Sequence, residues 1–350
     1  MKIGIANTSQ TSQEILVRIL GTVPHWKICC KAATDVDTIL QCALDCPDLL
    51  LIDVNFLVKN GLEVIDTLIK KSPCAIVITT DNIKENASIV FEAMGHGALD
   101  VVKIPDENQK EIGSFIKKFE QYEILLGKTP PKYKCETLGS SSQMAKSIYL
   151  EVALPSLILM GASTGGPLAL AKILSAFPQD SKASIIIIQH VDEQFARGFV
   201  EWLQLQTKLT VCLAENGVRP AEGVVLVAGT NHHLVMTSDL TLKYTEVSLG
   251  DIYHPSIDVL FSSVAKEWPE KSIAVLLTGM GKDGAVGLKA LRDVGWRTFV
   301  QEEESCVIFG MPKAALDLEA AEKALDLDNI SKEILTILKD KEQANPWRRS

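Results

Sequence analysis

The sequence lacks the features that mark secreted, membrane-spanning and zinc-stabilised proteins. Its amino terminus has a single lysine and a short apolar run that gives way to polar residues within a few positions, too short for the apolar core of a signal peptide, so we expect none. Apolar runs such as 157–160 and 185–188 are far shorter than the roughly 20 residues needed to cross a bilayer. The eight cysteines include no Cys-x-x-Cys pair, and Cys42 and Cys46, at a possible ligand spacing, have no second pair to complete a zinc site. We therefore expect a cytoplasmic protein with reduced thiols and no membrane insertion.

Positive charge is also in short supply. The chain has 35 Lys and Arg against 44 Asp and Glu, a formal net charge of −9, so we expect no nucleic-acid partner. Hydrophobic residues make up 47% and charged residues 23%, which excludes wholesale disorder. A length of 350 residues favours two domains.

The first part of the chain alternates short apolar runs with amphipathic stretches. The strand-like runs are 3–6, 49–52, 75–78 and 101–102, and the helical stretches are 14–20, 35–44, 62–70 and 89–94. This alternation is typical of βαβ units and a parallel sheet, which binds its ligands at the carboxyl ends of its strands. Asp53 and Thr79 follow two of these runs, so we expect both at that edge.

Turn and linker residues interrupt this pattern over 127–152, and a second α/β pattern follows. Its strand-like runs are 157–160, 185–188, 224–227, 273–277 and 298–300, and its helical stretches are 168–177, 257–267 and 286–294. We expect a second, mostly parallel sheet with some antiparallel elements around 208–245. The predicted domains are thus 1–126 and 153–342, with a linker between them and a tail at 343–350.

Residues 161–167, Gly-Ala-Ser-Thr-Gly-Gly-Pro, stand between a predicted strand and a predicted helix. They match G-x-S-x-G, in which the glycines permit a tight turn that exposes the serine hydroxyl near the helix amino terminus. Backbone amides at that terminus can stabilise an oxyanion. Ser163 is therefore a candidate nucleophile, and the alternative is a glycine-rich turn with an N-cap serine.

A nucleophilic serine needs a base, and His190 is well placed to supply it. It follows the strand 185–188, the next one after the Ser163 helix, so adjacent parallel strands would bring both residues to one rim. The strand 273–277 leads into a glycine loop that carries Asp283, a carboxylate able to orient the imidazole. His232 and His233 also follow a strand, and either line the same rim or lie in a solvated loop.

The same glycine loop permits a rival interpretation. Gly279-x-Gly281-x-x-Gly284 formally matches a dinucleotide-binding fingerprint, with acidic residues at 302–304 about 20 residues later. Against it, Asp283 would place a negative charge in a loop that should cradle pyrophosphate, and Ser163 and His190 would be left unexplained.

Five segments together resemble the chemotaxis protein-glutamate methylesterases, the CheB family. They are 161–167, 189–190, 255–261, 278–284 and 305–312. The resemblance covers nearly the whole chain and implies Ser163 as nucleophile, His190 as base and Asp283 as its orienting acid. Thr164 and Met280 match positions that support the site in the family.

The resemblance also implies a fold and an activity. The fold is a flavodoxin-like (βα)5 receiver domain followed by a doubly wound, mostly parallel α/β methylesterase domain. The activity is hydrolysis of glutamyl methyl esters, with deamidation of glutamines in many relatives, on methyl-accepting chemoreceptors during sensory adaptation. The esterase needs no metal or cofactor, and a chemotaxis histidine kinase is a further implied partner.

The receiver-like part departs from the family's pattern. Asp53 matches the phosphoacceptor and Thr79 the switch hydroxyl, and phosphorylation by that route needs Mg²⁺ held by nearby carboxylates. The family's acidic pair falls on Asn7 and Thr8, and its lysine falls on Ile104, with Lys103 one position off and expected on the other face. We therefore predict weak or absent phospho-control, unless Asn7 and Asp48 or another group still hold the metal.

Two assignments stay open at this point. The run 91–100 looks most like methylesterases of Wsp-type surface-sensing chemosensory systems. Besides the serine hydrolase, the sequence admits a non-catalytic regulator that docks on receptors or a kinase, and a dinucleotide-binding oxidoreductase.

Overall fold

Complete burial characterises the central strands of this protein. In the computed structural model every residue of β3 (Leu49–Asp53), β6 (Ser156–Ala162) and β7 (Ala183–Gln189) is buried. Near-continuous apolar strands are typical of parallel sheets whose two faces are both covered by helices. The structure describes residues 1–81, 83–105, 109–126, 154–247 and 252–344. The predicted linker, 127–152, lies outside them, as do the last six residues of the predicted tail.

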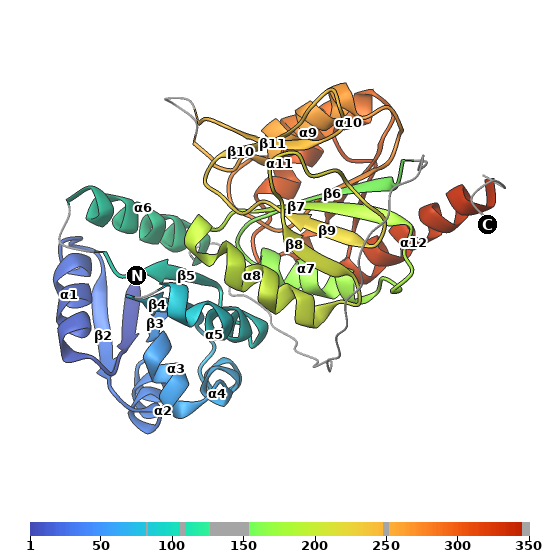
Figure 1. The fold of residues 1–350 in the computed structure, drawn as a ribbon. Coiled ribbons are helices and arrows are strands. Elements are labelled where there is room, and N and C mark those ends of the chain that lie inside the picture. Colours follow the sequence, from blue (N-terminus) through green and yellow to red (C-terminus); the bar gives the residue numbers. More distant parts are fainter. Residues whose placement is uncertain (82, 106–108, 127–153, 248–251, 345–350) are drawn as a thin grey trace. The chain divides into compact units, whose positions relative to one another are not determined.

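The chain divides into two compact units, Met1–Thr137 and Leu138–Ser350. The first holds a five-stranded parallel sheet in the order β2-β1-β3-β4-β5. Its other strands are β1 (Lys2–Ala6), β2 (Lys27–Ala32), β4 (Ala75–Thr80) and β5 (Asp100–Lys103). Its helices are α1 (Gln10–Leu20), α2 (Asp35–Leu44), α3 (Val54–Asn60), α4 (Glu63–Lys71), α5 (Ile83–Gly95) and α6 (Gln109–Leu126). This confirms the expected (βα)5 architecture (Figure 1).

The second unit is built on a seven-stranded sheet in the order β14-β13-β12-β6-β7-β9-β8. Its remaining strands are β8 (Thr210–Leu213), β9 (Val224–Val227), β12 (Ile273–Leu276), β13 (Arg297–Gln301) and β14 (Lys323–Leu325), with β10 (His233–Met236) and β11 (Leu242–Thr245) forming a separate hairpin. Its helices are α7 (Gly166–Ser175), α8 (Glu193–Gln206), α9 (Ile257–Glu267), α10 (Ala285–Asp293), α11 (Met311–Asp317) and α12 (Leu327–Ala344), and one 3₁₀ turn spans Glu303–Ser305.

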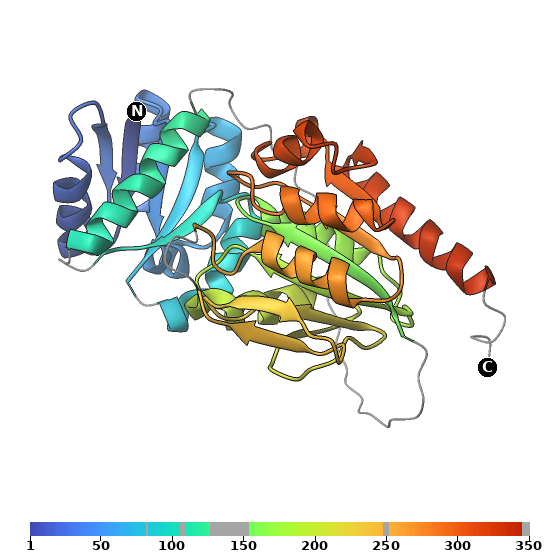
Figure 2. The same ribbon diagram turned by 90° about the horizontal axis from the view of Figure 1, so that it is seen from above.

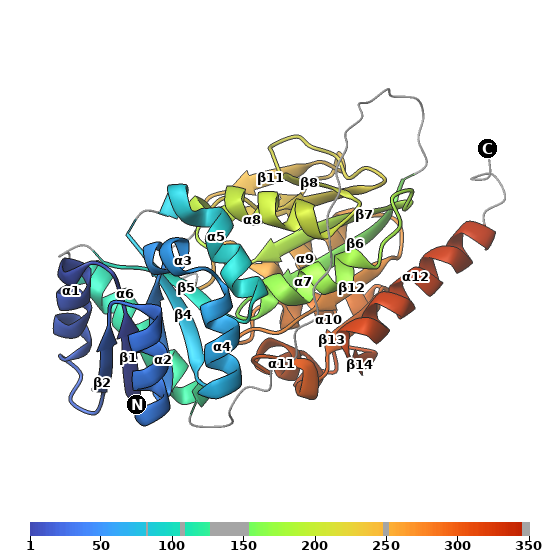
Figure 3. The same cartoon turned by 90° about the horizontal axis from the view of Figure 1, so that it is seen from below.

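Helices cover both faces of this sheet. Helices α9 and α10 and the β10–β11 hairpin lie over one face (Figure 2), and α7, α8 and α12 lie over the other (Figure 3). The apolar residues between these layers include Leu159, Ile186, Phe261 and Leu276, all fully buried. This confirms the doubly wound α/β expectation for the second unit. Among the described residues, no helix is long and apolar enough to span a membrane.

The structure also departs from the sequence-based expectations. Strand β2 was missed because it lies at the edge of its sheet, where burial alternates and no long apolar run is needed. The helical stretches named from the sequence also left out α3, α6, α8, α11 and α12. Over 208–245 only the β10–β11 pair is antiparallel, while β8 runs parallel to β9 within the main sheet. His233 lies buried on β10, so the solvated loop considered for it is wrong.

The packing of α9 in the core of the second unit should contribute strongly to its stability. Phe261 is fully buried on α9, so Phe261→Ala is expected to lower the free energy of unfolding by about 3–5 kcal/mol. Leu205→Ala on α8, where the side chain is 55% exposed, should change it by less than about 0.5 kcal/mol. Urea unfolding followed by circular dichroism measures both, and similar losses in the two variants would contradict this account of the core.

Candidate active site

Three adjacent strands bring the predicted serine, histidine and aspartate to one rim. Strand β6 lies between β12 and β7, and its last residue, Ala162, pairs with Gln189 at the end of β7. Ser163 and His190 each follow by one residue, and the His190 amide donates to the Ala162 carbonyl at 3.0 Å. On the other side the Ser163 amide donates to the Thr278 carbonyl, also at 3.0 Å. The chain leaves β6 towards β7 on one side and returns as β12 on the other, which is the position where doubly wound sheets bind ligands.

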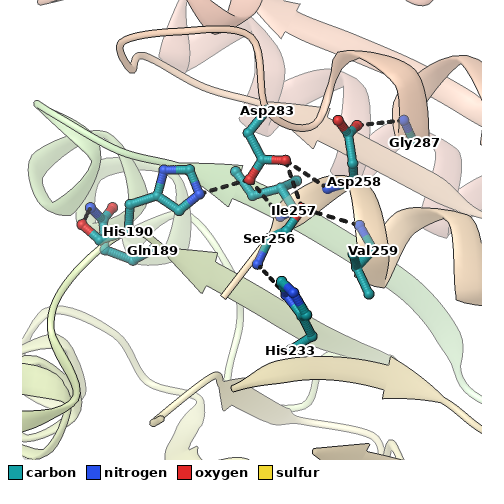
Figure 4. A network of polar contacts seen from close by, with 9 residues as sticks. All are labelled: Gln189, His190, His233, Ser256, Ile257, Asp258, Val259, Asp283 and Gly287. Atoms are coloured by element: carbon teal, nitrogen blue, oxygen red, sulfur yellow. Dashed lines mark hydrogen bonds and ion pairs between the residues drawn. The ribbon is translucent and has the colours of Figure 1, made fainter. Parts of the chain in front are cut away.

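His190 and Asp283 form a direct ion pair. The Nε2 atom of His190 lies 2.8 Å from Oδ2 of Asp283, and the two side chains are 15% and 1% exposed (Figure 4). A carboxylate can only accept here, so Nε2 carries the proton, and Nδ1 of the neutral ring keeps its lone pair. The phenol ring of Tyr253 stacks on the imidazole with centroids 5.4 Å apart and an interplanar angle of 5°. The pair and the stack together fix the ring orientation.

The Asp283 carboxylate is held by three further donors, all at the amino terminus of α9. Ser256 Oγ donates to Oδ1 at 2.8 Å, the Ile257 amide to Oδ2 at 2.7 Å and the Asp258 amide to Oδ1 at 3.1 Å (Figure 4). Burial by itself would raise the pKa of Asp283. The bonds from His190, Ile257 and Asp258 outweigh burial, so the pKa lies below its ordinary value and the group is a carboxylate at neutral pH.

Ser163 stands in the turn between β6 and α7. Its carbonyl accepts from the Gly166 amide at 2.7 Å and from Gln189 Nε2 at 2.9 Å, so the turn is tied both to α7 and to the end of β7. Within the described residues no hydrogen bond joins the Ser163 hydroxyl to His190. Such bonds are often long without substrate and tighten when substrate binds.

The two predicted supporting positions, Thr164 and Met280, stand in the two backbone segments that meet at Ser163. Thr164 follows it, and the Thr164 carbonyl accepts from Thr278 Oγ1 at 3.0 Å. Met280 follows Gly279, whose Cα lies so close to Ser163 that an added Cβ would stand 2.7 Å from the serine Cβ. Backbone segments from β6 and β12 therefore meet beside the serine.

The glycine loop that suggested a dinucleotide fingerprint is filled by the protein itself. At position 279 only glycine fits, because any Cβ there would collide with Ser163. Gly284 has a φ of +85°, and a Cβ on it would lie 2.5 Å from Leu276 Cδ1. Asp283 stands between these glycines in the sequence, and its carboxylate accepts hydrogen bonds from the backbone amides at the start of α9. These contacts explain the glycine spacing without a nucleotide, so the oxidoreductase interpretation loses its main support.

Several residues of the site were missed as functional positions. Ser256 and Asp258 stand in a segment that carries the family resemblance but received no role, and Tyr253 gave no signal at all. The sequence did allow one prediction about this segment: Ser256 stands directly before an amphipathic stretch, as a helix N-cap does. Nothing in the sequence shows that this helix begins against Asp283.

Asp258 joins the amino termini of α9 and α10. Its Oδ1 accepts from the Gly287 amide at 2.6 Å (Figure 4). Burial raises the pKa of Asp258 to about 6; the bond from Gly287 opposes this rise, and the neighbouring charge of Asp283 adds to it. At neutral pH the folded protein therefore holds two carboxylates close together.

In the first unit the carboxyl rim brings together Asn7, Asp53 and Thr79. Asn7 follows β1, Asp53 ends β3 and Thr79 is the last but one residue of β4, and all three are buried. Asp53 accepts from the Asn55 amide at 2.9 Å, and burial raises its pKa. Lys103 pairs in register with Thr80, whereas Thr79 pairs with Val102, so Lys103 lies on the other face, as predicted.

Mg²⁺ is the metal that the resemblance implies at this rim, and the residues do not fit it. Asn7 is neutral, its Oδ1 already accepts from the Ser9 amide at 2.7 Å, and its buried Nδ2, a donor, has no partner in the described part of the chain. The suggestion that Asp48 serves as a substitute ligand is wrong. Asp48 precedes β3 and accepts a hydrogen bond from the Lys2 amide at the opposite end of the sheet. Across the described ranges no three His, Cys, Asp or Glu side chains form a metal-binding group.

The raised pKa of Asp258 makes a testable statement about stability. An aspartate whose folded pKa exceeds its unfolded value destabilises the fold increasingly as pH rises from about 4 to about 6. Asp258→Asn keeps an oxygen for the Gly287 amide and removes this titration. We expect the variant to match the wild type near pH 4 and to be more stable by about 1 kcal/mol at pH 7.5, an amount reduced by solvent screening. Urea unfolding across this range measures the difference, and a pH-independent difference would contradict it.

Known proteins supply independent evidence on this chain. The family model described as CheB methylesterase matches residues 158–334. A Pseudomonas aeruginosa protein named protein-glutamate methylesterase/protein-glutamine glutaminase 3 is 39% identical over 335 residues, 95% of this chain and 98% of that protein. A Pseudomonas fluorescens protein with the same name, numbered 1, is 40% identical over 341 residues, 96% and 99% of the two chains.

A solved structure agrees. The crystal structure of the Thermotoga maritima CheB methylesterase catalytic domain superimposes with a TM-score of 0.51 and 29% identity, covering 53% of this chain and 100% of that one. These matches span the candidate active site and nearly the whole chain. The chain therefore belongs to the CheB methylesterase family.

Proposed function

We propose that the protein is a protein-glutamate methylesterase and protein-glutamine glutaminase, with Ser163, His190 and Asp283 as its catalytic residues. The observation that carries the proposal is the buried His190–Asp283 pair on the rim where Ser163 leaves the neighbouring strand. The relatives' names give the same activity.

The reaction follows from this geometry in two steps. Ser163 Oγ attacks the ester carbonyl carbon while His190 Nδ1 takes the hydroxyl proton, giving a tetrahedral oxyanion. The bond to the methoxy group breaks, and the histidine returns the proton so that methanol leaves. Water then attacks the acyl-enzyme with the same histidine as base, releasing glutamate and regenerating the serine. With glutamine as substrate, ammonia leaves in place of methanol.

Asp283 serves this cycle by holding the imidazole and by stabilising its positive charge after each proton transfer. Its low pKa keeps it ionised, so it holds His190 without competing for the proton. Every step uses side chains or backbone of this chain, and the esterase as proposed needs no cofactor.

The proposed substrates are methyl-accepting chemoreceptors, and a chemotaxis histidine kinase is a proposed partner. We place the reaction in the cytoplasm, which agrees with the seven unpaired thiols among the described cysteines. Membership of the Wsp-type group rests on the run 91–100 alone and stays a prediction.

We also propose that phospho-control through Asp53 is weak or absent. Support comes from the neutral Asn7 at the rim, from Lys103 on the other face and from the raised pKa of Asp53, which disfavours the ionised nucleophile.

The esterase proposal is tested with membranes that carry radiolabelled methylated chemoreceptors. Ser163→Ala is expected to lower methanol release by at least about 10³-fold, because the nucleophile is lost. Ser175→Ala, on the helix that follows Ser163, is the matched control and should keep full activity, since its hydroxyl donates only to the Lys172 carbonyl on the same helix.

The outcomes separate the remaining function classes. Equal release by wild type and Ser163→Ala would remove Ser163 from the mechanism. No release by the wild type, with receptor still bound, would favour the non-catalytic docking regulator. Tight binding of NAD without methanol release would favour the oxidoreductase.

The receiver proposal is tested by incubating the full chain with Mg²⁺ and a small acyl-phosphate donor, followed by intact-mass measurement. The wild type should stay unmodified, because the rim lacks the acidic pair and the lysine. Asn7→Asp combined with Ile104→Lys should increase phosphorylation several-fold, and Asp53→Asn in that background should abolish the increase. Stable, stoichiometric phosphorylation of wild-type Asp53 would refute the proposal.

A further inference from the structure

Among the described residues, every hydrogen-bond donor to the Asp283 carboxylate other than His190 comes from the amino terminus of α9. Ser256, Ile257 and Asp258 are consecutive, and each gives one donor to the carboxylate (Figure 4). Two of these donors are backbone amides, which any sequence would supply once the helix is in place. The Ser256 hydroxyl is the one contribution that depends on the residue type.

Ser256 is held from both sides in the orientation that this bond requires. Its Oγ accepts from the Val259 amide at 3.4 Å, the N-cap contact of α9, so the single hydroxyl proton is free to point at Asp283 Oδ1. Its own amide donates to Nδ1 of His233, a buried ring on β10, at 3.1 Å. A chain of hydrogen bonds therefore runs from the β10 hairpin through Ser256 and Asp283 to His190.

We propose that Ser256 is a positioning residue for the ester hydrolysis, acting through Asp283 and touching no substrate. Oδ1 accepts from Ser256 and from the Asp258 amide, which turns Oδ2 towards His190. With only 1% of the side chain exposed, water cannot readily replace a lost donor. Removing the hydroxyl leaves the carboxylate with one hydrogen-bond donor fewer. The carboxylate then either turns away from His190 or stabilises less well the imidazolium that forms in the transition state.

This inference rests on the proposed function, and the two are separable. Ser256→Ala and Ser256→Gly remove the hydroxyl; glycine is a good N-cap, so it preserves the start of α9 where alanine weakens it. Ser256→Thr keeps the hydroxyl. Ser263→Ala is the matched control on the same helix, because Ser263 Oγ bonds the Leu260 carbonyl and the Met236 amide but not Asp283.

Methanol release from methylated receptors gives kcat and KM for each folded variant. We expect Ser256→Ala and Ser256→Gly to lower kcat by about 10- to 100-fold, the effect of losing a hydrogen bond to a charged group, with KM within about twofold. The rate at which a fluorophosphonate labels Ser163 should fall in parallel, since it reports serine activation without receptor docking. Ser256→Thr should restore kcat to within about threefold, and Ser263→Ala should keep it.

Other results would overturn the role. If Ser256→Gly keeps its kcat within about threefold, or if Ser263→Ala loses as much, Ser256 only caps the helix. If Ser256→Thr folds but does not recover kcat, the hydroxyl is not what supports catalysis, and the proposal is equally contradicted. Methanol release that survives Ser163→Ala would instead refute the proposed function.

Discussion

The buried carboxylate of Asp283 is the constraint around which the second unit is organised. An ionised group removed from water is stable only when paired and fully hydrogen-bonded, and here the donors are one imidazole, one hydroxyl and two amides. To supply them, the loop after β12 must meet the first turn of α9, and His190 must reach across from β7. The sheet order places β6 between those two strands, so the serine comes to the same place.

The two units show how similar rims differ in chemistry. Asp53 and Asp283 are both buried at the carboxyl ends of parallel strands, yet burial raises the pKa of the first while hydrogen bonds lower that of the second. Asp283 has a histidine and a helix terminus beside it, whereas Asp53 has the neutral Asn7 across the rim. The first unit thus has the architecture of a receiver, with a neutral asparagine at the position of one of the family's acidic residues.

Sequence reasoning placed Ser163, His190 and Asp283 at one rim because they stand directly after, or in the loop after, strongly apolar strands. Parallel pairing leaves little freedom in where such residues meet. Sequence reasoning failed where position depends on packing between distant elements. Ser256 lies 27 residues before Asp283, and only the docking of α9 against the loop brings them together. The same holds for the stacking of Tyr253 on His190, and for the burial of His233, which stands on a strand of the hairpin that packs against α9. Strand β2 was not predicted because a half-exposed strand at the edge of a sheet needs no continuous apolar run.

One consequence concerns the first turn of α9. The leading amides of a helix have no partner within the helix and usually exchange their hydrogens quickly with solvent. In this protein the amides of Ile257 and Asp258 are bonded to a buried carboxylate. The rate at which these two amides exchange with deuterium therefore reports how often Asp283 breaks its hydrogen bonds to α9. Slow exchange would mean that this part of the site stays assembled most of the time.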